Sequence, residues 1–195
     1  MRLTALALFA GLIAAPAAQA ADAYSLDPGH TQVRASWNHA GYSEQSLLFR
    51  DVGGDIKIDF EDPSKTSLNI VIPVKGIDTG VEAFDKHLAS GDFFEADKHP
   101  EATFVSTSVE KTGDATLKVT GDLTIKGTSK PVTLDVVVNN SGAHPLGQFI
   151  DYYKGEWVGV TATGVITRSD WGLGFGAPIT SDAIDLFISA ELKKN

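Results

Sequence analysis

The segment "LKVTGDLTIK", residues 117–126, decides the fold class of this chain. Its apolar side chains stand at alternate positions, with polar side chains or glycine between them (Leu117, Val119, Leu123, Ile125). A period of two is typical of a β-strand with one face toward a core and the other toward solvent. A helix would instead need apolar positions three and four apart. The segment therefore predicts a sheet protein.

Similar alternation recurs in seven further segments, although it is less regular in one of them, residues 104–109. The others are residues 33–37, 55–60, 68–72, 132–138, 158–166 and 184–192. Short turn-forming segments such as 61–65 and 111–114 connect neighbouring strands, whereas parallel pairing would need long crossover connections. We therefore predict an all-β fold of about eight mainly antiparallel strands.

Closure of the sheet follows from the strand number and length. Eight long strands can close on themselves, which removes the exposed edges that promote aggregation. A sandwich of Greek keys would be expected to have shorter strands. An eight-stranded antiparallel up-and-down barrel is thus favoured, and a barrel of this size is either filled by side chains or holds one small ligand. An open lumen that suits a long apolar chain is favoured by small residues predicted to point inward: Ala35, Gly121, Ala162, Gly164 and Ala190. A filled core is the alternative.

The first 20 residues have the pattern of a secretory signal peptide. Arg2 is followed by an apolar run, Leu3 to Ala15, and by the cleavage pattern Ala18-Gln19-Ala20. We therefore predict a signal peptide over residues 1–20, a single domain over residues 21–195, and export to a bacterial periplasm. The apolar run is too short to span a bilayer, so no stable membrane insertion is expected.

Composition narrows the chemistry. The chain has no cysteine, which excludes thiol chemistry, cysteine-ligated zinc and iron–sulfur sites. Its formal net charge of −9 makes nucleic acid and anionic membranes poor partners, because both require clustered Lys and Arg.

The segment "FDKHLASG", residues 84–91, predicts a short helix at one end of the barrel. Phe84 and Leu88 are four apart and share a helix face, and Ser90-Gly91 provides a stop. Asp85 and His87 are two apart, so on a helix they point in different directions and cannot act as a local catalytic pair.

Motifs of common catalytic sites are missing from the sequence: there is no G-x-S-x-G, no H-E-x-x-H and no P-loop. His30, His39 and His87 could converge with Asp85 as zinc ligands, but their spacing matches no strong metal motif. We predict no catalytic residue, no metal and no cofactor, with that zinc site as an open alternative.

Several sequence blocks, in order along the mature chain, carry a family resemblance. They are residues 24–30 (YSLDPGH), 37–41 (WNHAG), 78–80 (DTG), 84–94 (FDKHLASGDFF), 99–104 (HPEATF), 121–127 (GDLTIKG), 130–132 (KPV), 168–172 (RSDWG) and 181–182 (SD). In these blocks the chain resembles the YceI-like family of polyisoprenoid-binding periplasmic proteins. The resemblance implies a lipocalin-like barrel around an apolar tunnel that holds an isoprenoid, quinone-like or fatty-amide chain, and it implies no settled catalytic activity.

Together the pattern and the resemblance predict a periplasmic carrier of such a lipid, linked to isoprenoid quinone metabolism, transport or stress response, and not an enzyme. The predicted tunnel residues are Val33, Trp37, Ile56, Ile58, Ile70, Phe84, Leu88, Phe93, Phe94 and Phe104. The predicted polar groups at the tunnel mouth are His39, Asp85, His87 and Arg168. Two alternatives stay open: an enzyme or accessory factor that acts on the lipid head group through His39 or His87, and assembly as a homodimer.

Overall fold

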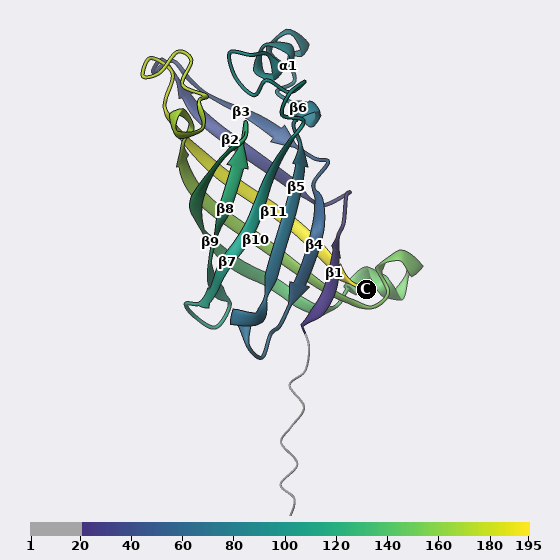
Figure 1. Ribbon diagram of the computed structural model, residues 1–195. Coiled ribbons are helices and arrows are strands. Elements are labelled where there is room, and N and C mark those ends of the chain that lie inside the picture. Colours follow the sequence, from purple (N-terminus) through teal and green to yellow (C-terminus); the bar gives the residue numbers. More distant parts are fainter. Residues whose placement is uncertain (1–20) are drawn as a thin grey trace, which may run out of the picture.

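A computed structural model describes residues 21–195 as an antiparallel sheet rolled into a barrel (Figure 1). Eight strands form the closed ring: β1 (Asp22–Leu26), β4 (Gly53–Ile58), β5 (Ser67–Pro73), β7 (Glu101–Lys111), β8 (Thr116–Ile125), β9 (Thr128–Ala143), β10 (Glu156–Thr167) and β11 (Ala183–Lys194). The predicted all-β, eight-stranded antiparallel barrel is confirmed. The predicted signal peptide lies outside the described residues.

Strand order in the ring follows the chain. From β4 to β11, ring strands that follow one another in sequence are hydrogen-bonded neighbours, as the up-and-down prediction required. The ring closes where β1 pairs with both β4 and β11. This seam brings the two ends of the domain together, with Tyr24 opposite Lys194 and Leu26 opposite Leu192.

Three strands outside the ring extend the sheet beside β11. They are β2 (Gln32–His39), β3 (Ser43–Phe49) and β6 (Ile77–Asp78). The predicted strand over 33–37 belongs to β2, so the eighth strand of the ring is β1, and neither β1 nor β3 nor β6 was predicted as a strand. The reason is local: the first four residues of β3 are exposed polar side chains, and β1 and β6 are too short to show a clear period.

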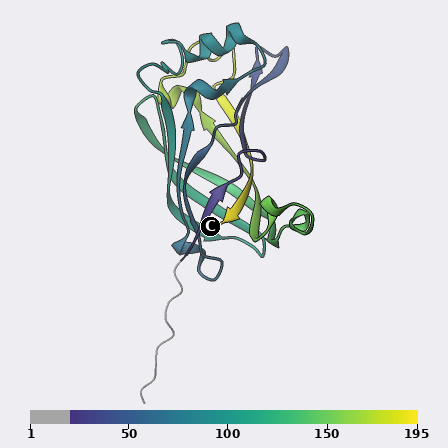
Figure 2. The ribbon, with the colours of Figure 1, turned by 90° about the vertical axis from the view of Figure 1, so that its right-hand side faces the viewer.

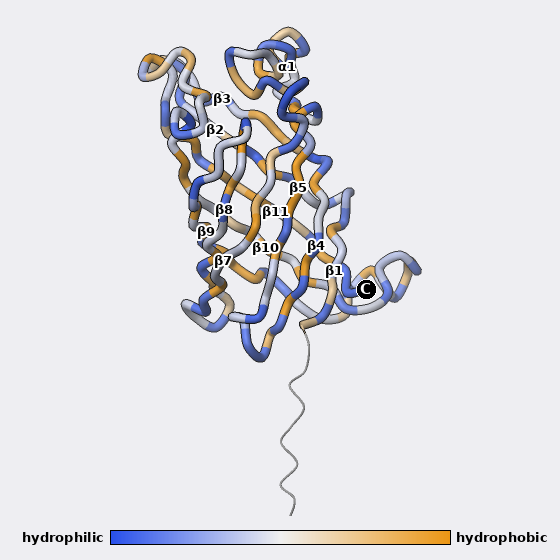
Figure 3. The backbone as a smooth tube through the Cα atoms, viewed as in Figure 1, coloured by the Kyte–Doolittle hydropathy of each residue, from blue (hydrophilic) through white to orange (hydrophobic). Residues whose placement is uncertain are grey.

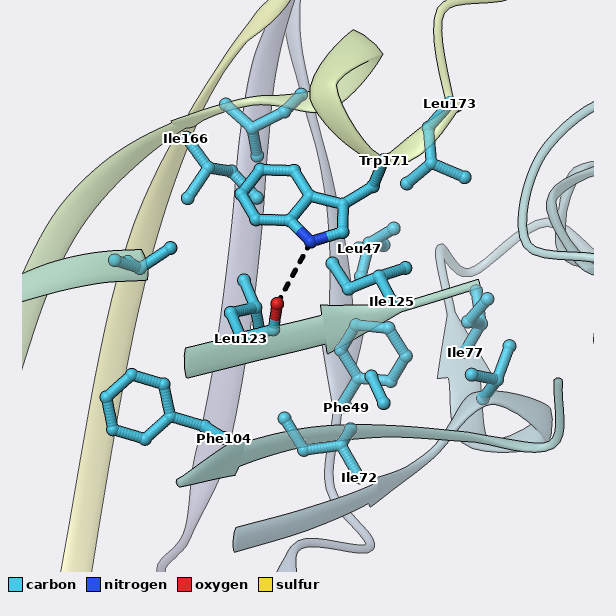
Figure 4. Packing of buried hydrophobic residues seen from close by; sticks show 14 of the residues in the cluster. Leu47, Phe49, Ile72, Ile77, Phe104, Leu123, Ile125, Ile166, Trp171 and Leu173 are labelled. Carbon is cyan, nitrogen blue, oxygen red and sulfur yellow. Dashed lines mark hydrogen bonds between the residues drawn. The ribbon is translucent and has the colours of Figure 1, made fainter. Parts of the chain in front are cut away.

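Side chains on alternate positions build the core inside the barrel, and the alternation is visible as changing colour along the strands in Figure 3. The larger of two buried clusters includes Trp37, Phe49, Phe104 and Trp171. The smaller cluster packs along the β1 seam and includes Tyr24 and Leu192. Figure 4 shows part of the larger cluster, in which Trp171 Nε1 donates a hydrogen bond of 3.0 Å to the Leu123 carbonyl.

The two ends of the barrel differ. The helix α1 (Glu82–Ala89) lies at one end, here called the helix end, and confirms the predicted helix (Figures 1 and 2). The opposite end, here called the terminus end, carries the C-terminus and a segment with two 3-10 turns, η3 (Pro145–Gln148) and η4 (Asp151–Tyr153). Three further turns are η1 (Pro63–Lys65), η2 (Val74–Gly76) and η5 (Arg168–Trp171). Within residues 21–195, none of the helices has the length and apolar character needed to cross a membrane.

Candidate functional site

The interior of the barrel contains a cavity of 630 Å³ whose wall is largely apolar. Small-molecule sites commonly enclose about 300–1,000 Å³, so the cavity is large enough for a ligand. All ten residues predicted to form the tunnel line its wall: Val33, Trp37, Ile56, Ile58, Ile70, Phe84, Leu88, Phe93, Phe94 and Phe104. Their contact with a ligand stays a prediction.

The small inward residues do not all contribute space. Ala35, Ala162 and Ala190 line the cavity. A Cβ atom added at Gly121 would instead lie 2.4 Å from the Phe104 ring.

Gly164 is similar, because a Cβ atom there would lie 2.8 Å from Leu134 Cδ2. The expectation that both glycines leave voids was wrong, since neighbouring side chains occupy the space above them.

Aromatic packing covers the cavity at the helix end. The Trp37 and Phe84 ring centroids are 6.0 Å apart, and those of Phe49 and Phe94 are 6.2 Å apart in an edge-to-face arrangement that aromatic pairs favour. Leu88, on the inner side of α1, is 4% exposed. The helix therefore forms an apolar lid over this end of the cavity.

The terminus end has a different lining. It is formed by residues in and beside three turns and is richer in polar side chains: Asp59, Phe60, Pro63, Thr66, Lys111, Asp114, Ala115, Thr116, Asn140 and Ser141. Many of these residues are exposed, whereas the lining residues at the helix end are buried or half-buried. We infer that the cavity reaches solvent at the terminus end. Sequence reasoning missed this set; its one signal was the change from alternating strand to polar turn near residues 59–66 and 111–116.

Arg168 lies at the helix end, where it is 7% exposed and lines the cavity. Its Nε donates to the Ser181 carbonyl at 2.9 Å, and its Nη2 donates to the Thr180 carbonyl and Oγ1, each at 3.0 Å. Its Nη1 donates to the carbonyls of Leu173 and Phe175. All five N–H donors of the guanidinium are thus engaged in holding the loop that precedes β11.

The Arg168 guanidinium keeps its positive charge although it is buried. Burial lowers the pKa of the guanidinium, while the Asp182 carboxylate nearby opposes the shift. Because an arginine starts from a very high pKa, it stays charged at neutral pH. Its predicted role as a head-group ligand stays a prediction, and the observed contacts give it a structural role.

Asp85 and His87 anchor the lid from outside the cavity wall. Asp85 Oδ1 accepts hydrogen bonds from the backbone N–H of Thr79 at 2.8 Å and from its hydroxyl at 2.6 Å. The His87 ring packs edge-on against Phe93 at 5.2 Å and Phe175 at 5.8 Å. Asp85 therefore ties the helix to the segment after β6, and His87 packs over the lid.

His39 is exposed at the end of β2 and forms a bridge with Thr180. His39, Asp85 and His87 are not among the residues that line the cavity. The structure therefore brings the four predicted mouth residues to the helix end but places only Arg168 against the lumen.

His30 lies at a different part of the molecule. Its Nδ1 is 2.8 Å from Asp27 Oδ2 and 3.9 Å from Glu191 Oε2, near the C-terminal end of β11. That end of β11 and the helix α1, which carries His87, are at opposite ends of the barrel (Figure 1). The proposed convergence of His30 with His39, His87 and Asp85 as a zinc site is therefore wrong, because barrel closure separates them.

Hydrogen bonding sets the charges around His30. The hydrogen bond to Asp27 raises the pKa of His30. Burial by itself would raise the pKa of Asp27, but hydrogen bonds from His30 and from the Gly29 N–H outweigh it and lower that pKa. Asp27 is therefore ionised at neutral pH although it is buried.

These features define a closed antiparallel β-barrel with an apolar cavity that is covered by a helix at one end and bordered by exposed turns at the other. The chain belongs to the YceI-like domain family, whose model matches residues 24–192. It is 38% identical over 189 residues to a UPF0312 protein of Pseudomonas putida, covering 96% of this chain and 94% of that relative. The family resemblance found in the sequence is confirmed.

Solved structures show the same barrel. BcnA of Burkholderia cenocepacia matches with a TM-score of 0.74 at 25% identity, covering 85% of this chain and 98% of that chain. A polyisoprenoid binding domain from Saccharophagus degradans matches with a TM-score of 0.64 at 14% identity, covering 89% of this chain and 99% of that chain. The second likeness establishes the shared fold.

Proposed function

We propose that this protein is a periplasmic carrier that holds one long-chain lipid of the isoprenoid or quinone-like class in its barrel. The observation that carries the proposal is the 630 Å³ cavity, whose wall is overwhelmingly apolar. Family membership and the barrel that it shares with a polyisoprenoid binding domain support the same ligand class. The signal-peptide pattern of residues 1–20 supports the proposed periplasmic location.

Binding would be driven by the lipid tail. Each buried methylene contributes about 0.8 kcal/mol before ordering costs are subtracted, so a long chain inside the apolar wall gains most of the affinity. The head group would remain near the exposed turns of the terminus end, where the polar lining residues lie. We expect strong dependence of affinity on tail length and weak dependence on head-group chemistry.

Geometry supports a carrier over an enzyme that uses His39 or His87. Neither histidine lines the cavity. Arg168 is charged and lines the cavity at the helix end, but its N–H donors are engaged by backbone carbonyls and by the Thr180 hydroxyl. An acid–base group placed against a bound lipid would need a free nitrogen within hydrogen-bond reach of it.

Native mass spectrometry of protein purified gently from its own host tests the proposal. We expect a co-purifying lipid of isoprenoid mass at one molecule per chain. Added quinones or long-chain prenols should then raise the thermal unfolding midpoint of the delipidated protein. A protein that carries no lipid and whose thermal midpoint ignores every added quinone and prenol would contradict the carrier.

A further inference from the structure

A second cluster of polar side chains lies away from the apolar lumen, at the seam that closes the barrel. Asp27 follows β1 directly, His30 lies in the segment between β1 and β2, and Glu191 belongs to β11. Ala190 and Leu192 line the lumen, so the intervening Glu191 side chain points to the outer face of the sheet. The cluster therefore joins the first strand of the domain to the last one.

Three ligand atoms converge in this cluster. Asp27 Oδ2, His30 Nδ1 and Glu191 Oε2 all lie within 4.8 Å of one another. Asp27 Oδ1 accepts the Gly29 N–H at 2.8 Å, which fixes the carboxylate and directs Oδ2 toward His30.

Two of the separations lie on either side of the spacing that a divalent transition metal requires. Two of the distances are 2.8 Å (Asp27 to His30) and 3.9 Å (His30 to Glu191). Tetrahedral zinc, with bonds of about 2.0–2.2 Å, holds its ligand atoms about 3.3–3.6 Å apart. To reach that spacing, Asp27 Oδ2 and His30 Nδ1 would move apart by about 0.5–0.8 Å, which replaces their hydrogen bond, and His30 Nδ1 and Glu191 Oε2 would approach by about 0.3–0.6 Å.

An unsatisfied acceptor gives the independent sign of a missing ligand. Glu191 Oε2 is closed off from solvent and, among the residues that the structure describes, has no hydrogen-bond partner. A buried carboxylate oxygen without a donor is costly, so it calls for a water, a proton or a cation.

His144 supports Glu191 from the segment before η3. Its Nδ1 accepts the Leu146 N–H at 3.2 Å, which leaves the proton on Nε2. That Nε2 lies 3.7 Å from Glu191 Oε2, and the imidazole stacks on Tyr153 at 4.4 Å. His144 is thus placed to orient the Glu191 carboxylate, as residues around metal ligands commonly do.

We propose that Asp27, His30 and Glu191 form a zinc-class metal site on the outer face of the barrel, with His144 as the positioning residue for Glu191. One imidazole and two carboxylates form a ligand set that zinc accepts, and three protein ligands leave a fourth position open. The His30 side chain is half exposed, which provides a path for the ion. Because the ligands come from both sides of the seam, the metal cross-links β1 to β11. This proposal does not depend on the lipid in the lumen.

Zinc titration of the mature chain, without an affinity tag and after dialysis against a chelator, tests the site. We expect one Zn²⁺ per chain, and Co²⁺ in its place should give the intense visible absorption of a four-coordinate ion. Glu191→Gln and His30→Ala should each weaken Zn²⁺ binding at least tenfold. His99→Gln is the matched control, because it removes an imidazole near the turn between β8 and β9 and should leave the affinity unchanged.

Two results would overturn the site. One is a wild-type chain that binds no Zn²⁺ in competition with a weak chromophoric chelator. The other is Zn²⁺ binding that survives both substitutions unchanged, which would indicate adventitious surface binding. Because His30→Ala removes a hydrogen-bond donor from the buried Asp27 carboxylate, some loss of stability is expected, and far-UV circular dichroism checks that each variant keeps its sheet.

Discussion

Replacing Ala162 by phenylalanine would block the lumen while preserving the barrel. Ala162 lies in β10 and lines the cavity. Its neighbours on the adjacent strands are Val136 and Ile188, both half-buried and both part of the same wall. A phenyl ring introduced there would therefore extend into the cavity and not into a packed layer.

The size of the effect follows from the space that the ring takes. A phenyl group displaces about five methylene equivalents of a bound tail, each contributing about 0.8 kcal/mol, or about 4 kcal/mol in total. A flexible chain recovers part of this by taking another path, so we expect a loss of about 2–4 kcal/mol. This corresponds to binding about 30- to 700-fold weaker. Stability should change by less than about 1 kcal/mol, because the ring enters open space and avoids the strain of an overfilled core.

Displacement of a fluorescent apolar probe by a long-chain prenol measures the affinity, and urea unfolding measures the stability. Thr163→Phe is the matched control, because Thr163 is the next residue of β10 and is exposed on the outer face. It should leave prenol affinity at the wild-type value. A folded Ala162→Phe protein that binds the prenol as tightly as wild type would refute the assignment of the lumen as the binding site.

Three further predictions concern the helix end. Trp171→Phe removes the buried hydrogen bond to the Leu123 carbonyl and should lower the free energy of unfolding by about 1–3 kcal/mol in urea titration. Arg168→Lys leaves at least two of five acceptors without a donor, and a loss of about 2–5 kcal/mol is expected by the same measurement. Ser169→Ala removes the largest cause of the lowered pKa of Asp182, a hydrogen bond of 2.6 Å. A carboxylate whose pKa is lower in the folded than in the unfolded protein stabilises the fold at pH values above the unfolded-state pKa. The difference in free energy of unfolding between Ser169→Ala and wild type should therefore be present at pH 7 and vanish at low pH, as the carboxylate protonates. A difference that persists in acid would contradict this cause.

Local pattern was enough to predict much of the fold. Alternation such as that of residues 117–126 depends only on which side chains share a face of a strand, and this is a property of a few consecutive residues. The same holds for the helix, where Phe84 and Leu88 must share a face. For this reason seven of the eight ring strands, the lid and ten of the residues that line the cavity could be predicted from the sequence.

The predicted polar site depended on more than local pattern. Asp85, His87 and Arg168 have the residue types that a head-group site would use, but their partners are fixed by the fold. Thr79 and the loop before β11 bind Asp85 and Arg168, and neither partner is implied by the spacing. A residue type shows which hydrogen bonds a side chain can make, whereas the packed neighbours decide which ones it does make.

The choice of strands that close the barrel was the step that only the tertiary structure decided. The sequence by itself determined that the chain forms amphipathic strands, because apolar and polar residues alternate along it with a period of two. Pairing of β1 with β11 joins residues at opposite ends of the chain, and no local signal encodes it. That pairing separates His30 from His87 and places His30 beside Glu191. Contacts between residues far apart in sequence thus determined how the ring closes and where the polar cluster forms.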